Sequence, residues 1–367
     1  MSSLYIGVMS GTSLDGVDAV AVDFSNRIRS LGHVGMPMPQ ALKQVFLQLN
    51  QAGHDELHLA ALAANDLVAV YAAAVHALLD RLELPVSAIA AIGAHGQTVR
   101  HQPRWQAGVG YTWQLNNPAL LAERTGIPVV ADFRSRDIAA GGQGAPLVPA
   151  FHQHVFSQAG QTIAVLNIGG MANLSILQDD LVLGFDCGPG NVLLDAWCQS
   201  HTGQAFDQSG QWAAGGQAAP ALLTQMLGEP FFSMPPPKST GRDLFHMAWL
   251  DKHVRVVPGL SAVDVQATLA ALTAQTCADQ VRRQAPHARQ LLVCGGGAFN
   301  LHLMHLLALA LPEMVVTSTD SQGLPPMQVE AAAFAWLARQ TLLHLPGNLP
   351  MVTGAQGPRV LGAVYPA

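Results

Sequence analysis

The residues that decide the fold open the chain. They are the apolar run Leu4-Tyr5-Ile6-Gly7-Val8, the turn Ser10-Gly11-Thr12-Ser13-Leu14-Asp15-Gly16, and an alternating run from Val17 to Phe24. A short apolar run bounded by turn residues is typical of a buried strand, and alternation is typical of a strand with two different faces. The stretch therefore predicts two strands joined by a tight hairpin.

The same order returns in the second half of the chain. Thr162-Ile163-Ala164-Val165-Leu166 predicts a strand, Gly169-Gly170-Met171-Ala172 a turn, and Asn173 to Leu177 and Leu181 to Phe185 two further strands. The later elements also correspond, as helix, strand, short helix and strand: Leu57 to Leu82, Ile89 to Ile92, Pro118 to Arg124 and Pro128 to Ala131, against Val263 to Arg283, Leu291 to Cys294, Asn300 to Leu309 and Met314 to Thr317. Each half ends with another helical stretch, at 145–156 and 326–343. Alternating strands and helices indicate an α/β fold, and the repeated order predicts a duplicated domain.

The repeat sets the expected domain boundaries. We expect a first domain at 1–135, joined by the tail at about 345–367, and a second at 136–344 with an insertion at about 200–260. A chain of 367 residues, half of them hydrophobic, can bury two cores. A net charge of −6 leaves no basic surface for nucleic acid. No signal sequence or apolar run of about 20 residues is evident, so we expect a cytoplasmic protein without a membrane partner.

Cysteine and histidine spacing gives no metal motif. Cys187, Cys198, Cys277 and Cys294 include no C-x-x-C pair, which favours buried, reduced thiols. The pairs His54/His58 and His302/His305 lack the acidic residue of a zinc-binding helix. The sequence therefore predicts no zinc site.

Three glycine-rich turns follow predicted strands at 11–16, 169–173 and 295–300. Such turns expose backbone N–H groups and let an anion approach closely. The pattern G-x-G-x-x-G is absent, and Lys238-Ser239-Thr240 follows three prolines rather than a glycine loop, so neither a dinucleotide motif nor a Walker motif is present. Three such turns on a duplicated scaffold indicate a nucleotide held between two lobes.

Several charged residues are candidates for the chemistry. Asp186 ends a predicted strand, where an α/β sheet commonly binds ligands, although a turn or helix-capping role is the alternative. One of Asp15, Asp18 and Asp23 could hold Mg²⁺ through water. Arg134 lies in a loop after a strand, where an arginine suits carboxylate or phosphate recognition or a surface ion pair.

Two further features of the second half have open roles. Glu330 is the lone acid of an otherwise apolar predicted helix, and such a residue faces either solvent or a site. Residues 235–243 form a stiff, charged segment that is a candidate lid or simply a loop.

Six segments together resemble those of the anhydro-N-acetylmuramic acid kinases, and the likeness runs from the first strand to the tail. They are Gly7-Val8-Met9-Ser10-Gly11-Thr12-Ser13-Leu14-Asp15-Gly16-Val17-Asp18, Gly93-Ala94-His95-Gly96-Gln97-Thr98, Asn167-Ile168-Gly169-Gly170-Met171-Ala172-Asn173, Phe185-Asp186-Cys187-Gly188-Pro189-Gly190-Asn191, Pro236-Pro237-Lys238-Ser239-Thr240-Gly241-Arg242 and Cys294-Gly295-Gly296-Gly297-Ala298-Phe299-Asn300. The resemblance implies a two-lobed actin/hexokinase-like (ribonuclease H-like) fold with duplicated βββαβαβα domains. It also implies ATP and Mg²⁺ in the cleft between the lobes, and a homodimer.

The resemblance implies an activity as well. The enzyme would hydrolyse the 1,6-anhydro ring of 1,6-anhydro-N-acetylmuramic acid and phosphorylate O6, giving N-acetylmuramate 6-phosphate and ADP. This reaction belongs to peptidoglycan recycling and amino-sugar catabolism.

Residue roles carry over on the matching motifs. Asp186 falls on the general base that activates water. The phosphate loop matches Gly11, Thr12, Ser13, Leu14, Asp15, Gly16, Val17 and Asp18. The other two glycine turns supply the further candidate nucleotide contacts Gly169, Gly170, Asn173, Gly295, Gly296 and Gly297. The sugar side matches His95, Gln97, Arg134 and Glu330. The Asp-x-Gly common in the wider superfamily is replaced here by Met9-Ser10-Gly11, so the metal ligands stay open.

Three other functions are compatible with the same residues. A kinase of another sugar or sugar acid would use Asp186 to deprotonate a hydroxyl. An actin-like nucleotide switch would use the glycine turns without catalysis on a sugar. A glycoside hydrolase with two carboxylates needs no ATP and leaves the three turns unexplained.

Overall fold

The computed structural model describes residues 2–105, 108–179 and 181–367, and the chain divides into two units. Unit 1 contains Met1–Phe151 and Gln328–Ala367, and unit 2 contains His152–Met327. The division differs from the expected boundaries because residues 136–151 and 328–344 belong to unit 1. The helix at 329–342 packs on the first sheet, so its contacts assign it to that unit although the sequence pattern made it the last element of the second half.

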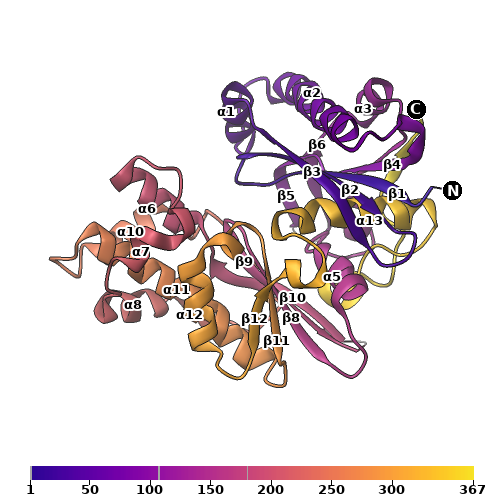
Figure 1. Ribbon diagram of the computed structural model, residues 1–367. Coiled ribbons are helices and arrows are strands. Elements are labelled where there is room, and N and C mark those ends of the chain that lie inside the picture. Colours follow the sequence, from indigo (N-terminus) through magenta and orange to yellow (C-terminus); the bar gives the residue numbers. More distant parts are fainter. Residues whose placement is uncertain (1, 106–107, 180) are drawn as a thin grey trace. The chain divides into compact units, whose positions relative to one another are not determined.

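The sheet of unit 1 has the strand order β13-β7-β4-β1-β2-β3 (Figure 1). Its strands are β1 (Leu4–Ser10), β2 (Gly16–Asp23), β3 (Arg29–Pro37), β4 (Ile89–Ala94), β7 (Val129–Ala131) and β13 (Ala363–Tyr365). β1, β2 and β3 form an antiparallel meander, whereas β4 runs parallel to β1 and β7 parallel to β4. β13 brings the C-terminal tail antiparallel to β7.

Helices cover both faces of this sheet (Figure 1). α1 (Gln40–Leu49), α2 (Glu56–Leu82) and α3 (Pro118–Thr125) lie on one face, where they share a core with Ile6 and Val8. α13 (Val329–Leu342) lies on the other face and approaches Gly7 and Gly93 so closely that a Cβ at either glycine would overlap its backbone. The alternation along β1 thus sends successive residues to two different helical layers.

α2 is the one described helix that is long and apolar enough to span a membrane by length and composition. Its residues Leu67, Val68 and Tyr71 are fully buried in the core of unit 1. Packing on the sheet therefore accounts for its apolar character.

The sheet of unit 2 has the order β10-β9-β8-β11-β12, and its pairings repeat those of unit 1. Its strands are β8 (Thr162–Ile168), β9 (Met171–Gln178), β10 (Leu181–Pro189), β11 (Gln290–Cys294) and β12 (Val315–Ser318). β8, β9 and β10 form the meander, and β11 and β12 add in parallel. When the strands of each sheet are numbered by their order within the unit, both sheets contain the spatial order 3-2-1-4-5; β5 and β6 form a separate sheet and are not counted. The shared order confirms the duplicated α/β fold.

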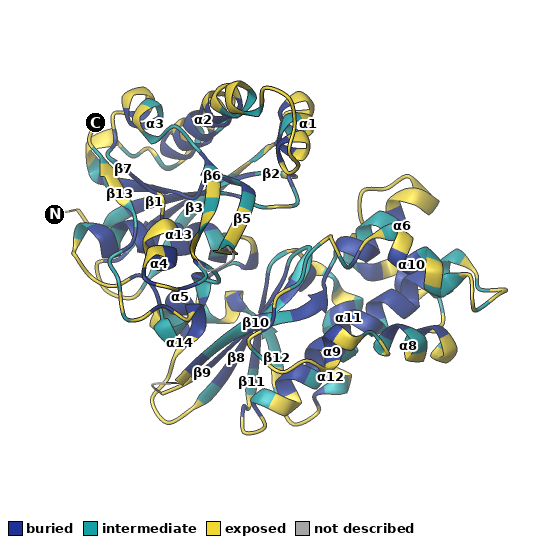
Figure 2. Cartoon of the chain, turned by 180° about the vertical axis from the view of Figure 1, so that it is seen from behind, coloured by how far each residue is buried: buried dark blue, intermediate teal, exposed yellow. Residues whose placement is uncertain are grey.

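α11 (Ala262–Gln284) connects two cores within unit 2, and the burial colours of Figure 2 run dark along it. Its second half packs with α12 (Leu301–Ala310) on the sheet. Its first half packs on the inserted helices, which are α6 (Val192–Thr202), α7 (Gln211–Ala214), α8 (Pro220–Leu227), α9 (Pro230–Ser233) and α10 (Met247–Val254).

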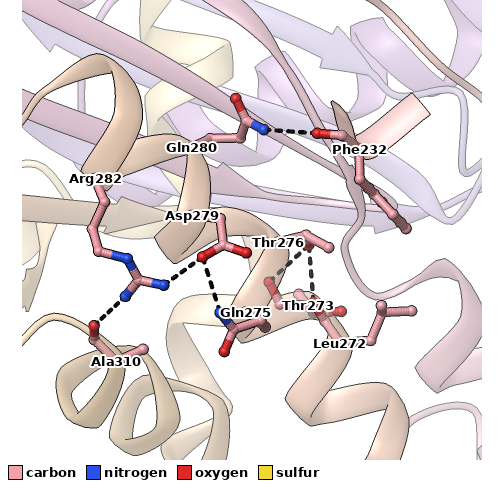
Figure 3. A network of polar contacts seen from close by, with 9 residues as sticks. All are labelled: Phe232, Leu272, Thr273, Gln275, Thr276, Asp279, Gln280, Arg282 and Ala310. Carbon is pink, nitrogen blue, oxygen red and sulfur yellow. Dashed lines mark hydrogen bonds and ion pairs between the residues drawn. The ribbon is translucent and has the colours of Figure 1, made fainter. Parts of the chain in front are cut away.

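Polar contacts fix α11 to its neighbours (Figure 3). Arg282 pairs with Asp279 and donates a hydrogen bond of 2.6 Å to the carbonyl of Ala310, near the C-terminus of α12. Gln280 donates to the carbonyl of Phe232 in the insertion. One helix thereby ties the insertion and the sheet together.

Some elements of unit 1 were not anticipated. The strand β3 and the hairpin of β5 (Gln97–Trp105) and β6 (Gly108–Leu115) occupy stretches for which no strand was predicted. The remaining helices of the unit are α4 (Ser135–Ala139), α14 (Pro350–Thr353) and α5 (Val148–Phe156), within which the unit boundary falls.

A buried carboxylate joins the tail to the loop after β7. Asp137 is fully buried, and its Oδ2 accepts from the backbone N–H of Gly144 at 2.7 Å. Its Oδ1 accepts from Asn348 Nδ2 at 2.6 Å and Thr353 Oγ1 at 2.7 Å. Three donors from two distant segments thus satisfy one charge.

We expect Asp137→Ala to destabilise unit 1 by about 2–4 kcal/mol, because three buried donors lose a charged acceptor. Asp66→Ala, on an exposed position of α2, should change stability by no more than about 0.5 kcal/mol. Urea unfolding followed by circular dichroism measures both. Equal midpoints for the two variants would contradict this account of the Asp137 contacts.

Candidate active site

The first glycine turn joins β1 to β2 in unit 1. Leu14 closes it by donating from its backbone N–H to the Gly11 carbonyl at 3.2 Å, with φ of 59°. The side chains of Leu14 and Val17 are buried in the core, so they anchor the turn and leave only their backbone for a ligand. Thr12 and Asp15 are exposed. The tip of the hairpin is therefore polar and its base is apolar.

The three aspartates of this region have different surroundings. Asp15 lies 3.7 Å from Lys43 Nζ, and its side chain is 79% exposed. Asp18 Oδ1 lies 2.7 Å from His33 Nε2. Asp23 accepts from Ser25 and Ser3, and the Ser25 N–H is the main cause of its lowered pKa. Asp23 thus serves a turn, and Asp15 is the carboxylate of the three most open to a hydrated ion.

The predicted sugar-side residues gather in unit 1. Arg134 Nη2 lies 2.9 Å from His95 Nε2, and Arg134 Nη1 donates to the carbonyl of Gly144 at 2.8 Å. The His95 ring packs on Phe334 of α13 at 4.6 Å between centroids. Glu330, in the first turn of α13, is near enough for its charge to raise the pKa of Arg134. Gln97 Nε2 donates to the Gly11 carbonyl at 3.3 Å and so links this group to the first turn.

Burial controls the charges of this group. It lowers the pKa of His95 to about 3, with the Arg134 charge adding to the effect. It lowers the pKa of Arg134 to about 10, against the charges of Glu330 and Asp137. At neutral pH His95 is therefore neutral and Arg134 is charged. Since Arg134 can only donate, His95 Nε2 accepts and the ring proton is on Nδ1.

Four side chains here have buried polar atoms without a hydrogen bond among the described residues: His95 Nδ1, Gln97 Oε1, Arg134 Nε, and both amide atoms of Asn116. Asn116 had not been predicted. It lies beside Gly96, where an added Cβ would be 3.2 Å from the Asn116 Cβ. Buried polar atoms without partners are rare in folded proteins, and a polar ligand or water is the usual explanation.

The predicted base lies in unit 2, within β10 rather than at its end. Asp186 pairs with Asn173 of β9, and the register then shifts so that Cys187 is an extra residue in the strand. Such a bulge re-aims the neighbouring side chains. The backbone N–H of Thr240 donates to Asp186 Oδ2 at 2.9 Å, and Oδ1 accepts no hydrogen bond from a described residue. Burial raises the pKa of Asp186 to about 6, and the Thr240 N–H and the Lys238 charge oppose the rise.

Strand register also places Asn173. It pairs with Asn167 of β8 on one side and Asp186 on the other. Directly paired residues share a face of the sheet. Asn173 therefore neighbours the predicted base, whereas sequence spacing had grouped it only with the nucleotide turn.

The second and third glycine turns meet in unit 2. A Cβ on Gly295, which has φ of 76°, would lie 2.4 Å from Asn167 Oδ1, and one on Gly297 would lie 2.4 Å from the Ile168 side chain. Gly169 and Gly170 accept from the N–H groups of residues 190–192 at the start of α6. The ends of the parallel strands β8 and β11 thus form one crowded edge, the usual ligand position in such sheets.

The third turn contains a short helical element. A 3₁₀ turn, Gly296–Phe299, separates Gly295 from α12, so the helix does not begin behind the glycines. Asn300 caps α12 by accepting from the N–H of Leu303. The predicted site residues therefore form two groups, one in each unit.

Comparison with known proteins identifies the family. The model of the family "Anhydro-N-acetylmuramic acid kinase" matches residues 3–367. The chain belongs to this family. A relative of that name from Albidiferax ferrireducens is 57% identical over the whole of both chains. Another, from Pseudomonas putida, is 52% identical, also over the whole of both chains.

A solved structure supports the fold. Component A of the (R)-2-hydroxyglutaryl-CoA dehydratase of Acidaminococcus fermentans has a TM-score of 0.50 with this chain at 10% identity, covering 91% of this chain and 98% of that one. Membership of the anhydro-N-acetylmuramic acid kinase family makes the chain a phosphotransferase that acts on a sugar hydroxyl, which confirms the predicted kinase over the switch and the hydrolase. The kinase fold implies that ATP is the phosphoryl donor.

We expect Gly295→Ala to raise the Kd for ATP at least about tenfold, which corresponds to 1.4 kcal/mol. The added Cβ would overlap Asn167 and distort the edge of the sheet. Gly323→Ala is the matched control, since Gly323 has φ of 80° with nothing within 4 Å of an added Cβ. Isothermal titration calorimetry with ATP distinguishes them. A Kd for Gly295→Ala as low as that of the control would show that this edge does not hold the nucleotide.

Proposed function

We propose that this kinase acts on 1,6-anhydro-N-acetylmuramic acid, opens its anhydro bridge with water, and transfers the γ-phosphoryl group of ATP to O6. The products are N-acetylmuramate 6-phosphate and ADP. The observation that carries the proposal is identity above 50% over whole chains to kinases named for this substrate. Asp186, held by one oxygen, supplies the base that the hydrolytic half requires.

The chemistry follows from the surroundings of Asp186. With a pKa of about 6, the carboxylate is mostly ionised above pH 7 and still basic enough to accept a proton from water. The water oxygen bonds to the anomeric carbon as the C1–O6 bond breaks. O6 then bonds to the γ-phosphorus as the bond from phosphorus to the ADP oxygen breaks. The proton taken by Asp186 leaves to solvent, which balances the reaction.

The residues of unit 1 are suited to the sugar. His95 Nδ1 and Arg134 Nε are buried donors and Gln97 Oε1 is a buried acceptor, and the substrate offers hydroxyl, amide and carboxylate groups to all three. We propose that these residues and Glu330 bind it. A ligand that satisfies all of them would be distinguished from one lacking a matching group.

Mg²⁺ fits the phosphate end of this proposal. The described residues contain no group of three His, Cys, Asp or Glu side chains able to hold a metal. Mg²⁺ usually keeps several waters and binds through one or two carboxylates and the phosphates of its substrate. We propose that the exposed Asp15 would hold such a hydrated ion, whose chemistry is to neutralise charge on the γ-phosphate.

The proposal extends to the cellular context and the assembly of the enzyme. We propose that the enzyme works in the cytoplasm in peptidoglycan recycling, and that it is a homodimer. Sedimentation equilibrium tests the assembly, since a mass of one chain, 38.7 kDa, at working concentration would exclude the dimer.

The reaction is tested with Mg²⁺-ATP and 1,6-anhydro-N-acetylmuramic acid in water enriched in ¹⁸O. We expect sugar-dependent ADP release and a product heavier than the substrate by one phosphate and one water, with the label at C1. A product that gains phosphate without water would show an ordinary kinase. No sugar-dependent ADP release would point to another sugar substrate.

We expect Asp186→Asn to lower kcat by about 10²–10⁴-fold, the usual contribution of a general base, while the Kd for ATP changes less than about twofold. Glu313→Gln, at a side chain that is 86% exposed, is the control and should be fully active. In the wild type, kcat/KM for the sugar should fall as pH drops through about 6, because protonation removes the base. Near-normal turnover of Asp186→Asn would remove the residue from this role.

A further inference from the structure

Lys238 is a buried lysine that the proposed reaction leaves unused. It is 6% exposed, and its Nζ donates to the carbonyls of Phe231 at 3.1 Å and Phe232 at 3.4 Å. The ammonium also lies 4.6 Å from the centre of the Phe231 ring. A lysine is almost never this buried without partners, and here two carbonyls and an aromatic face supply them.

Residues 231–240, the segment that contains Lys238, contact Asp186 through backbone hydrogen bonds. We name this segment the Lys238 strap. The Asp186 N–H donates to the Lys238 carbonyl at 3.1 Å. The Thr240 N–H donates to the Asp186 carboxylate at 2.9 Å. The two contacts fix both the backbone of Asp186 and one of its oxygens, beside the bulge where β10 departs from regular pairing.

The other end of the strap is fixed to the body of unit 2. Gln280 of α11 donates to the Phe232 carbonyl at 3.2 Å, which Figure 3 shows. Phe232 stacks on Phe245 at 5.5 Å, and a Cβ on Gly188 would lie 2.6 Å from the Phe232 ring. α11 therefore fixes the Phe232 carbonyl, which accepts from the ammonium, and the Phe232 ring lies against β10.

Among the described residues, Lys238 is the one cation whose charge acts on Asp186. The thiol of Cys187 follows Asp186 in β10 and is hydrogen-bonded to the thiol of Cys277 in α11. Arg283 of α11 acts on Lys238 rather than on Asp186 directly. Removing the ammonium would leave a half-buried carboxylate with no neighbouring cation among the groups that act on it, a setting that favours its protonated form.

We propose that Lys238 is a positioning residue for Asp186: its side chain anchors the strap that orients the carboxylate, and its charge keeps that carboxylate ionised. The inference rests on the proposed role of Asp186 as the base. It adds that the charge of Lys238, and not merely its packing, sets the pH range of the enzyme.

The test compares Lys238→Gln, Lys238→Arg and the control Lys252→Gln, an exposed lysine of α10. Glutamine keeps a donor for the Phe231 carbonyl and loses the charge. We expect the acid limb of kcat/KM for Lys238→Gln to move up by about 1 pH unit, within the range of a nearby opposite charge. Activity at pH 6 should then fall several-fold, because a one-unit rise in pKa leaves far less carboxylate ionised. Lys238→Arg and Lys252→Gln should keep the wild-type limb.

The outcomes separate this inference from the proposed function. A folded Lys238→Gln enzyme with an unmoved limb would overturn the charge role of Lys238, whatever Asp186 does. A Lys238→Gln chain that fails to fold, judged by circular dichroism, would reduce Lys238 to a structural residue and also overturn it. If Asp186→Asn stays active, the proposed base itself fails, and a moved limb in Lys238→Gln would then belong to another group.

Discussion

Unit 1 depends on how closely the backbone of α13 approaches its sheet. At Gly7 a Cβ would lie 1.7 Å from the carbonyl oxygen of Ala331, and at Gly93 it would lie 2.0 Å from that of Phe334. Only glycine permits this approach, and both glycines lie on central strands. The contact also brings candidate site residues together. His95, two residues after Gly93, packs on Phe334, and Glu330 precedes Ala331. A helix predicted as the last element of the second half thereby completes the polar group of unit 1.

In unit 2 the close approach of separate elements depends on backbone groups. Its glycines bring the end of β8, the start of α6 and the end of β11 together, and carbonyls of one turn accept from N–H groups of the next. The bulge at Cys187 and the Lys238 strap then set the direction of Asp186. Few side chains take part, so the geometry of this edge depends on backbone contacts that a single added methyl group would disturb.

The sequence pattern predicted the elements whose periodicity is strong. The β1–β2 hairpin, α2, the meander of unit 2 and α11 lie within a few residues of their expected ends, since alternation and turn residues coincide there. β3 was missed because most of Arg29–Pro37 is only partly buried and its pattern is weak. The β5–β6 hairpin lies outside the repeat and its described residues are a mixture of buried and exposed, so neither duplication nor hydrophobicity marks it.

The site shows the same limit. Motifs identified Asp186, His95 and Arg134 as residues of interest, yet periodicity could not reveal that Asn173 pairs with Asp186 or that Asn116 lies beside Gly96. Strand register and the approach of separate loops decide those contacts. The placement of α13 also depends on tertiary packing, which the order of elements along the chain does not encode.

The two units differ in how fully their polar groups are satisfied, and this difference has a physical consequence. In unit 2 one oxygen of Asp186 already accepts a hydrogen bond, so this carboxylate, the proposed base, is oriented by the protein itself. In unit 1 buried atoms of His95, Gln97 and Arg134 lack partners among the described residues, at about 1–3 kcal/mol for each such group. Such a loss of stability is tolerated where a bound ligand forms the missing hydrogen bonds. Binding energy from unit 1 is then greatest for a ligand that matches every unpaired atom, and selectivity arises from the penalty on those that leave one unpaired.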